Sequence, residues 1–149
     1  MWNDTKSLAL SKICVVLFMA LLIVCTVLAP RLISTLMRLS IQADLAGAAL
    51  FMGTIYAGCI PAAALLIFLY ILLRRIGDGQ VFVDENTACL RYISWCCFAG
   101  AAITLVSALY YLPWLAIGVS AAFVGLIVRV VKNVVAKAVS LQDDADYTI

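Results

Sequence analysis

The side chains most able to do chemistry in this sequence are six cysteines, because the sequence contains no histidine. Cysteines form disulfides or bind metals when their spacing brings the sulfur atoms together, and CxxC is a common spacing of this kind. No two of these cysteines have that spacing, and most lie in apolar runs, where a thiol behaves as a small hydrophobic group. We therefore expect no metal site, no cofactor and no disulfide framework. The cysteines are Cys14, Cys25, Cys59, Cys89, Cys96 and Cys97.

Carboxylates are the other candidates, since acid–base catalysis needs paired carboxylates or a nucleophile beside a base. The adjacent residues Asp84 and Glu85 are better explained as the start of a helix, with Asp84 capping its first turn. The long apolar stretches contain no paired carboxylates, and the commonest general base, histidine, is missing. We therefore expect no catalytic residues and no enzyme activity.

The composition is that of a membrane protein. Hydrophobic residues make up 66% of the 149 residues, charged residues only 12%, and the mean hydropathy is +1.15. A water-soluble domain of this length could not bury so much apolar surface, because small domains expose a large fraction of their surface. The net charge of +2 is too small to favour direct nucleic-acid binding. We expect the lipid bilayer to be the surrounding medium.

Stretches without charge define four membrane spans. A helix needs about 20 apolar residues to cross the hydrocarbon core. Residues 92–128 are uncharged and would form about 55 Å of helix, so we expect this stretch to fold back at Pro113, which is flanked by interfacial aromatic residues. The predicted spans are residues 13–29, 45–73, 92–112 and 115–135, and residues 31–44 are predicted to form an outer amphipathic segment.

The distribution of basic residues predicts the orientation. With four spans, eight of the ten Lys and Arg residues lie on one side of the membrane and only Arg31 and Arg38 on the other. By the positive-inside rule both termini face the cytoplasm, in a multi-pass protein of the cell membrane. The first span also has features of a signal peptide, but Pro30 would follow the cleavage site, which favours an uncleaved anchor. The predicted fold is all-α: a polytopic integral membrane protein whose four transmembrane helices form an antiparallel bundle.

Small residues recur along three of the spans. In lipid, helices associate where small side chains let the backbones approach, so these residues predict helix-packing faces. They favour an intramolecular four-helix bundle, and the alternative is a face for a homo-oligomer. The predicted packing residues are Ala49, Gly53, Ala57 and Pro61 in the second span, Gly100 in the third, and Gly118 with Ala122 and Gly125 in the fourth.

Two segments on the cytoplasmic side carry most of the polar residues. In the inner loop, residues 74–91, Gly77 and Gly79 allow the chain to leave the second helix. The acidic tail, residues 141–149, ends the chain either as a solvated segment or as a docking peptide. The residues that we expect to bind a partner or shape the loop are Phe82, Asp84, Glu85, Asn86 and Arg91 in the loop, and Asp143, Asp144 and Asp146 in the tail.

The inner loop also carries a motif. Residues 79–86 (GQVFVDEN) and 90–93 (LRYI) resemble the G-x-x-F-x-x-E-N-x-x-x-L-R-x-I signature of a bacterial membrane family catalogued as domain of unknown function 2975. The end of the chain is similar to the acidic tail of that family, and the order of four spans and central loop extends the resemblance over essentially the whole chain. The family has no established activity, and its members are frequently encoded beside a small Cro-type helix-turn-helix regulator. The resemblance therefore implies a cytosolic transcriptional regulator as a partner and no catalytic residue.

Two classes of function follow from these patterns. The first is a small regulatory or interaction protein that presents its inner loop and tail to a cytosolic partner. The alternative is a small transporter or channel component, alone or as an oligomer. Transport usually needs ionisable or polar groups at mid-membrane, and these spans offer only a few hydroxyl groups. The sequence therefore favours the first class.

Overall fold

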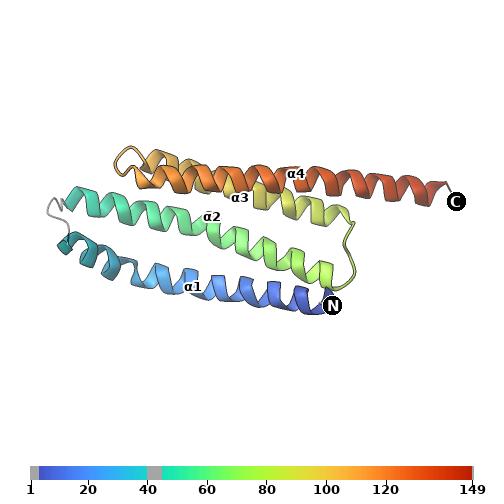
Figure 1. Ribbon diagram of the computed structural model, residues 1–149, viewed down its shortest axis with the longest axis horizontal. Coiled ribbons are helices and arrows are strands. Elements are labelled where there is room, and N and C mark those ends of the chain that lie inside the picture. The colour runs from blue at the N-terminus through green and yellow to red at the C-terminus, as the bar shows by residue number, and fades with distance from the viewer. Residues whose placement is uncertain (1–3, 40–44, 149) are drawn as a thin grey trace.

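The computed structural model describes residues 4–39 and 45–148, and in these ranges the regular structure is four α-helices (Figure 1). They are α1 (Asp4–Leu39), α2 (Leu45–Gly77), α3 (Asp84–Ser107) and α4 (Pro113–Tyr147). Each is long and apolar enough to cross a membrane. This confirms the predicted all-α class and the number of spans. Helices are expected here because a backbone in hydrocarbon must pair its own N–H and C=O groups.

The helices alternate in direction along the chain. The start of α1, the α2–α3 connection and the end of α4 lie at one end of the molecule, and the turn between α3 and α4 lies at the other (Figure 1). We call the first of these the basic end, because eight of the ten Lys and Arg residues belong to it by sequence. The basic residues of this end are Lys6, Lys12, Arg74, Arg75, Arg91, Arg129, Lys132 and Lys137.

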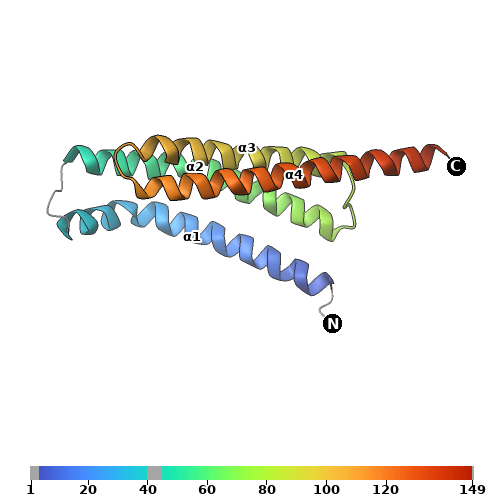
Figure 2. The same cartoon turned by 45° about the horizontal axis from the view of Figure 1, so that its top comes forward.

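The helices do not form the closed four-helix bundle that we expected. Among the described residues, α3 packs on both α2 and α4, whereas α1 contacts only α2. Figure 2 shows α1 diverging from the other helices toward its N-terminal end. An open arrangement is compatible with a membrane because lipid covers apolar side chains that would need a protein core in water. The side chains of α1 and α2 meet at Thr26 and Cys59, whose Oγ1 and Sγ atoms are 3.3 Å apart.

Helix α1 does not end at residue 29, where the first span is predicted to end. Helix α1 continues through Pro30 to Leu39, so the described part of the expected outer segment, residues 31–39, belongs to α1 and residues 40–44 lie outside the described ranges. Proline is tolerated inside membrane helices because neighbouring groups compensate for the missing N–H donor. Ala29 and Ile33 are buried on either side of this point, so the helix stays packed there rather than lying flat on a leaflet.

The third and fourth helices also differ from the predicted spans. Helix α3 begins eight residues earlier than predicted, at Asp84, and ends at Ser107 instead of residue 112. Helix α4 begins at Pro113, as the turn prediction requires, because the fixed φ of proline suits the first helical turn. It then continues to Tyr147 without a break, so most of the predicted acidic tail is helical.

Close contact between α3 and α4 depends on two of the predicted glycines. A Cβ atom at Gly118 would lie 2.8 Å from Leu105 Cγ, and one at Gly125 would lie 3.1 Å from Cys97 Cβ. The Ser94 hydroxyl donates a hydrogen bond to the Gly125 carbonyl oxygen at 3.1 Å. The small residues therefore allow the two backbones to approach and a side chain of one helix to bond to the backbone of the other.

The other predicted packing residues are placed differently. A Cβ atom at Gly53 or Gly100 would meet nothing within 4 Å, which corrects the expectation that both lie at tight helix contacts. Gly100 and Pro61 instead line an open, apolar groove of about 550 Å³ between α2 and α4, with α3 as its floor. Gly53 and Ala57 line a second groove between α2 and α3. Ala49 is exposed, and Ala122 is half-buried on α4. The stripes are less completely covered than expected because, among the described residues, α1 and α4 each pack against a single helix and do not contact each other.

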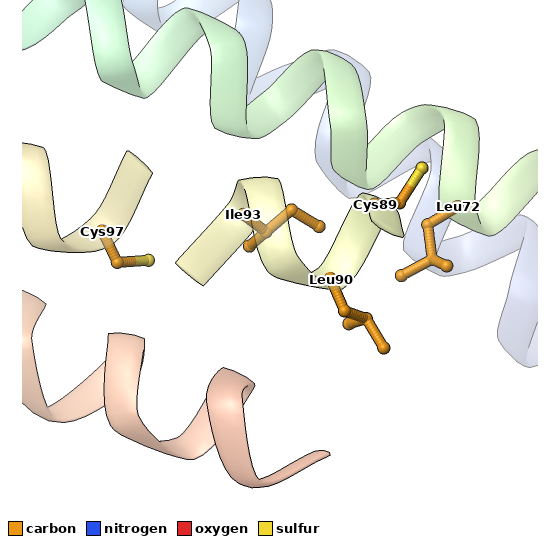
Figure 3. Close-up of a cluster of buried hydrophobic side chains, with 5 residues drawn as sticks. All are labelled: Leu72, Cys89, Leu90, Ile93 and Cys97. Carbon is orange, nitrogen blue, oxygen red and sulfur yellow. The ribbon is translucent and has the colours of Figure 1, made fainter. Parts of the chain in front are cut away.

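The main apolar cluster lies toward the basic end, between α2 and α3 (Figure 3). In this view Cys89 points toward α2, close to Leu72, whereas Leu90 points toward the side of α4. Val128 and Val135 of α4 pack against the same cluster. The cluster consists of Leu72, Cys89, Leu90, Ile93 and Cys97.

A group of hydroxyls joins α2 to the opposite end of α3. Thr54 Oγ1 lies 2.7 Å from Ser107 Oγ and 2.6 Å from the Tyr110 hydroxyl, and Thr54 and Ser107 are both buried. Phe51 packs edge-on against Tyr110 beside this group, with ring centroids 5.3 Å apart. Buried hydroxyls at membrane depth need such partners, so this network joins α2 and α3 at the end opposite the apolar cluster.

The different surroundings of Gly118 and Gly100 predict that alanine substitutions at these two positions change the stability of the protein differently. Gly118→Ala places a methyl group against Leu105 and should lower the free energy of unfolding by about 1–3 kcal/mol, as overpacking does. Gly100→Ala, on the partner helix, should cause no loss, because its methyl group meets open space and alanine favours helix by up to about 1 kcal/mol. Reversible unfolding in mixed detergent micelles measures both variants. Equal effects would contradict the proposed contact.

Candidate functional site

The connection between α2 and α3 is a short, ordered turn. The Gln80 N–H donates to the Arg75 carbonyl oxygen at 3.0 Å, and the Gly79 N–H donates to the Ile76 carbonyl oxygen at 3.1 Å. This pair of bonds is the Schellman motif, in which the residue after the helix takes a left-handed conformation. Gly79 has φ = 81°, which side chains disfavour, so a glycine is required at this position. The expectation that Gly79 lets the chain leave the helix is confirmed.

Asn86 fastens this turn to the first turn of α3. Its side-chain Nδ2 donates to the carbonyl oxygens of Gln80 and Val81, at 2.7 and 2.9 Å. The residue is only 1% exposed, and its Oδ1 atom is buried without a partner among the described residues. Asn86 was predicted as a site residue from the family motif alone. Its structure shows why an amide is needed there: two adjacent carbonyl oxygens require a donor with two N–H groups.

The predicted cap at Asp84 is wrong by one residue. The N-cap is Val83, which has an extended backbone (φ −128°, ψ 150°) and makes no side-chain capping bond. Asp84 is already the first helical residue, so its carboxylate cannot occupy the capping position. Asp84 and Glu85 are exposed in the first turn of α3, where negative charge complements the positive end of the helix dipole.

The remaining loop candidates point outward. Phe82 is 50% exposed and its neighbour Val81 is 42% exposed, so the tip of the turn presents two apolar side chains. Arg91, which lies nearly two turns after the start of α3, is also exposed. The predicted loop residues are therefore accessible, with the exception of Asn86, which holds the turn together.

The predicted tail residues lie on the end of α4, which projects beyond the other helices. Figures 1 and 2 show α4 extending beyond the ends of the other helices at the basic end. Val139 is buried, whereas residues 140–148 are exposed. Asp143, Asp144 and Asp146 therefore lie on exposed helix at the same end of the molecule as the α2–α3 connection.

One contact at the basic end was not predicted. The guanidinium carbon of Arg129 lies 5.9 Å from the centre of the Trp95 ring, a cation–π distance. Trp95 also packs edge-on against Phe98. The only signal for this contact in the sequence is the presence of a basic residue in one apolar stretch and an aromatic residue in another, and their register depends on how α3 and α4 pack.

The cysteines do not cluster at the basic end. The six cysteines are unpaired and distributed over α1, α2 and α3. Cys89 receives a long hydrogen bond from Arg75 Nη1, at 3.6 Å. Within residues 4–39 and 45–148, no group of three or more acidic or cysteine side chains is placed to hold a metal ion. The geometry at the basic end is suited to binding by surface charge and shape.

Four apolar helices of membrane-spanning length define a multi-pass helical membrane protein. The family model described as "Protein of unknown function (DUF2975)" matches residues 37–149. The chain therefore belongs to the DUF2975 family, as the motif in the α2–α3 connection predicted. Searches of curated proteins and of solved structures found no match.

The family match is shorter than we expected. It includes α2, α3 and α4 but omits residues 1–36, which contain nearly all of α1. The three matched helices are those joined through α3, and the omitted helix contacts α2 alone. The family resemblance thus coincides with the better-packed part of the structure.

The hydrogen bonds of Asn86 predict that substitutions at Asn86 and at the adjacent Thr87 affect the turn differently. Asn86→Asp removes both N–H donors and places a carboxylate against two carbonyl oxygens, which should destabilise the turn by about 2 kcal/mol or more. Amide hydrogen exchange of residues 78–83 should accelerate accordingly. Thr87→Val is the control, because the Thr87 hydroxyl is buried without a partner and its loss should not speed exchange. Unchanged exchange in Asn86→Asp would show that the turn does not need this amide.

Proposed function

We propose that this protein is a non-catalytic regulatory or interaction protein of the cell membrane. In this proposal the basic end faces the cytoplasm, and the α2–α3 connection and the end of α4 bind a cytosolic partner such as a helix-turn-helix regulator. The eight-to-two distribution of Lys and Arg supports this orientation. The family to which the chain belongs has no activity in its description, so the argument rests on surface chemistry.

The observation that carries the proposal is the projecting end of α4. It presents three aspartates on about two turns of exposed helix beyond the part that packs on the protein. A preformed helix loses less conformational entropy on binding than a disordered tail. Its negative charge complements a basic surface, and regulators that bind nucleic acid carry such surfaces.

The α2–α3 connection supports the same proposal from a second element. Phe82 is a half-exposed aromatic side chain on a turn that the Schellman bonds and Asn86 hold in one shape. Exposed aromatic side chains on rigid elements are typical anchors of protein interfaces. A partner that contacts both Phe82 and the end of α4 would combine an apolar anchor with charge complementarity.

The test is capture of a Cro-type helix-turn-helix regulator, of the kind frequently encoded beside genes of this family, with full-length protein in nanodiscs as bait. Asp143→Asn/Asp144→Asn/Asp146→Asn should weaken binding about tenfold or more, since each exposed charge pair contributes up to about 1 kcal/mol. Phe82→Ala should also weaken binding. Asp4→Asn is the control, because Asp4 is an exposed carboxylate in the first turn of α1 and lies outside both segments.

Binding of the regulator that is unchanged in both the tail variant and the Phe82 variant would refute the proposed surface. Loss of binding in the Asp4 control as well would indicate a non-specific charge effect and would equally refute it. The variants do not alter buried residues, so their helix content should match that of the parent protein by circular dichroism.

Transport is the weaker candidate. The described residues that line the larger groove are uncharged and almost entirely apolar, and the hydroxyls of Thr54, Ser107 and Tyr110 bond to one another. A polar solute would have to replace these bonds at a cost of several kcal/mol. Solute flux through proteoliposomes that depends on these three hydroxyls would favour transport instead.

A further inference from the structure

The outer face of the α3–α4 pair carries a compact group of basic and aromatic side chains near the basic end. Arg91 and Trp95 are one turn apart on α3, and Arg129 and Lys132 are one turn apart on α4. The contact between Arg129 and Trp95 shows that these two residues lie on one face of the helix pair, and Lys132 is half-buried beside it. The closeness of Gly125 to Cys97 and Phe98 sets an antiparallel register in which Arg91 is level with residues 131 and 132 of α4. We call these four residues the basic–aromatic patch.

The positive charges of this patch have no acidic neighbours along their own helices. The positions three and four residues from Arg91 hold Thr87, Ala88, Ser94 and Trp95, and the corresponding neighbours of Arg129 and Lys132 are uncharged or basic. The closest carboxylates in sequence, Glu85 and Asp84, are about two turns from Arg91, and they complement the start of α3. Arg129 and Arg91 are both exposed, so the patch presents unneutralised charge to its surroundings.

The depth of the patch makes this charge costly unless an anion is present. Sixteen residues separate Pro113 from Arg129, which is about 24 Å of helix, and the same separation relates Ser107 to Arg91. We place the opposite edge of the hydrocarbon core, which is about 30 Å thick, at the aromatic turn between α3 and α4. Both guanidinium groups then start from Cα atoms just inside the edge at the basic end. The Arg129 guanidinium lies over the Trp95 ring at a cation–π distance, and this interaction uses none of its N–H donors.

We propose that the basic–aromatic patch binds the phosphate of an anionic phospholipid in the leaflet at the basic end, with Arg91, Arg129 and Lys132 as donors and Trp95 against the upper part of the acyl chains. The guanidinium fork matches the geometry of phosphate oxygens, and basic pockets between membrane helices bind anionic headgroups. A lipid fits better than soluble phosphate, because an indole and the apolar flanks of both helices adjoin the charges. This site does not depend on the proposed regulatory function.

The test uses Trp95 as the reporter in full-length protein in which Trp2 and Trp114, the other two tryptophans, are replaced by Phe. In vesicles of brominated phosphatidylcholine, the bromine quenches Trp95 fluorescence, and added phosphatidylglycerol should relieve the quenching more than its mole fraction predicts. We expect phosphatidylglycerol to bind at least about fivefold more strongly than phosphatidylcholine, since one basic residue contributes about 1 kcal/mol.

Arg91→Gln/Lys132→Gln leaves the Arg129–Trp95 contact in place and should reduce this preference several-fold, since it removes two of the three basic donors. Arg74→Gln is the matched control, since Arg74 is an exposed basic residue at the same end but on α2, and it should keep the preference. No preference in the parent protein, or the same loss in the Arg74 control, would overturn the proposal. Relief of quenching by soluble glycerol phosphate would also overturn it, because the patch would then take its anion from water.

Discussion

Lipid offers no hydrogen-bond partners, so each backbone N–H and C=O group inside the bilayer must be paired within its own helix. This constraint explains why each described segment of membrane-spanning length is helical. It also explains why α1 passes through Pro30: ending the helix there would leave several backbone groups unpaired, whereas continuing it loses a single donor.

The same medium removes the usual reason for a closed core. Apolar side chains on α1 and α4 are satisfied by lipid, so contact between helices depends on close backbone approach and on polar contacts. In this protein α3 makes both kinds of contact with its neighbours. It meets α4 at Gly118 and Gly125, and it meets α2 through the cluster around Ile93 and the hydroxyls around Thr54. The peripheral helix, α1, is the one that the family match omits.

Polar chemistry is then concentrated where the helices leave the hydrocarbon. The turn after α2 is held by a left-handed glycine and by Asn86, and the end of α4 continues as exposed helix. Both segments hold exposed residues in fixed positions, and neither encloses a site. The basic–aromatic patch lies at the same end but closer to the middle of the helices. In the proposals made above, this end binds a cytosolic partner at its tip and an anionic headgroup at the patch.

The sequence by itself determined the class of protein, the number of helices and the turn at Pro113, because hydropathy and backbone preference are local properties. It pointed to Gly77 and Gly79 together as the exit from α2, and only the structure shows that Gly79 takes the left-handed conformation. The family motif identified Asn86, although its role as the donor to two carbonyl oxygens became clear only in three dimensions. The sequence could not decide which small residues lie at contacts. Gly118 and Gly100 both lie in stripes of small residues, but only Gly118 has a side chain of another helix against it. Which glycine lies at a contact depends on how each helix is rotated about its axis and which helices are neighbours. The meeting of Arg129 with Trp95 was decided by tertiary structure for the same reason: no local preference relates two helices across a turn.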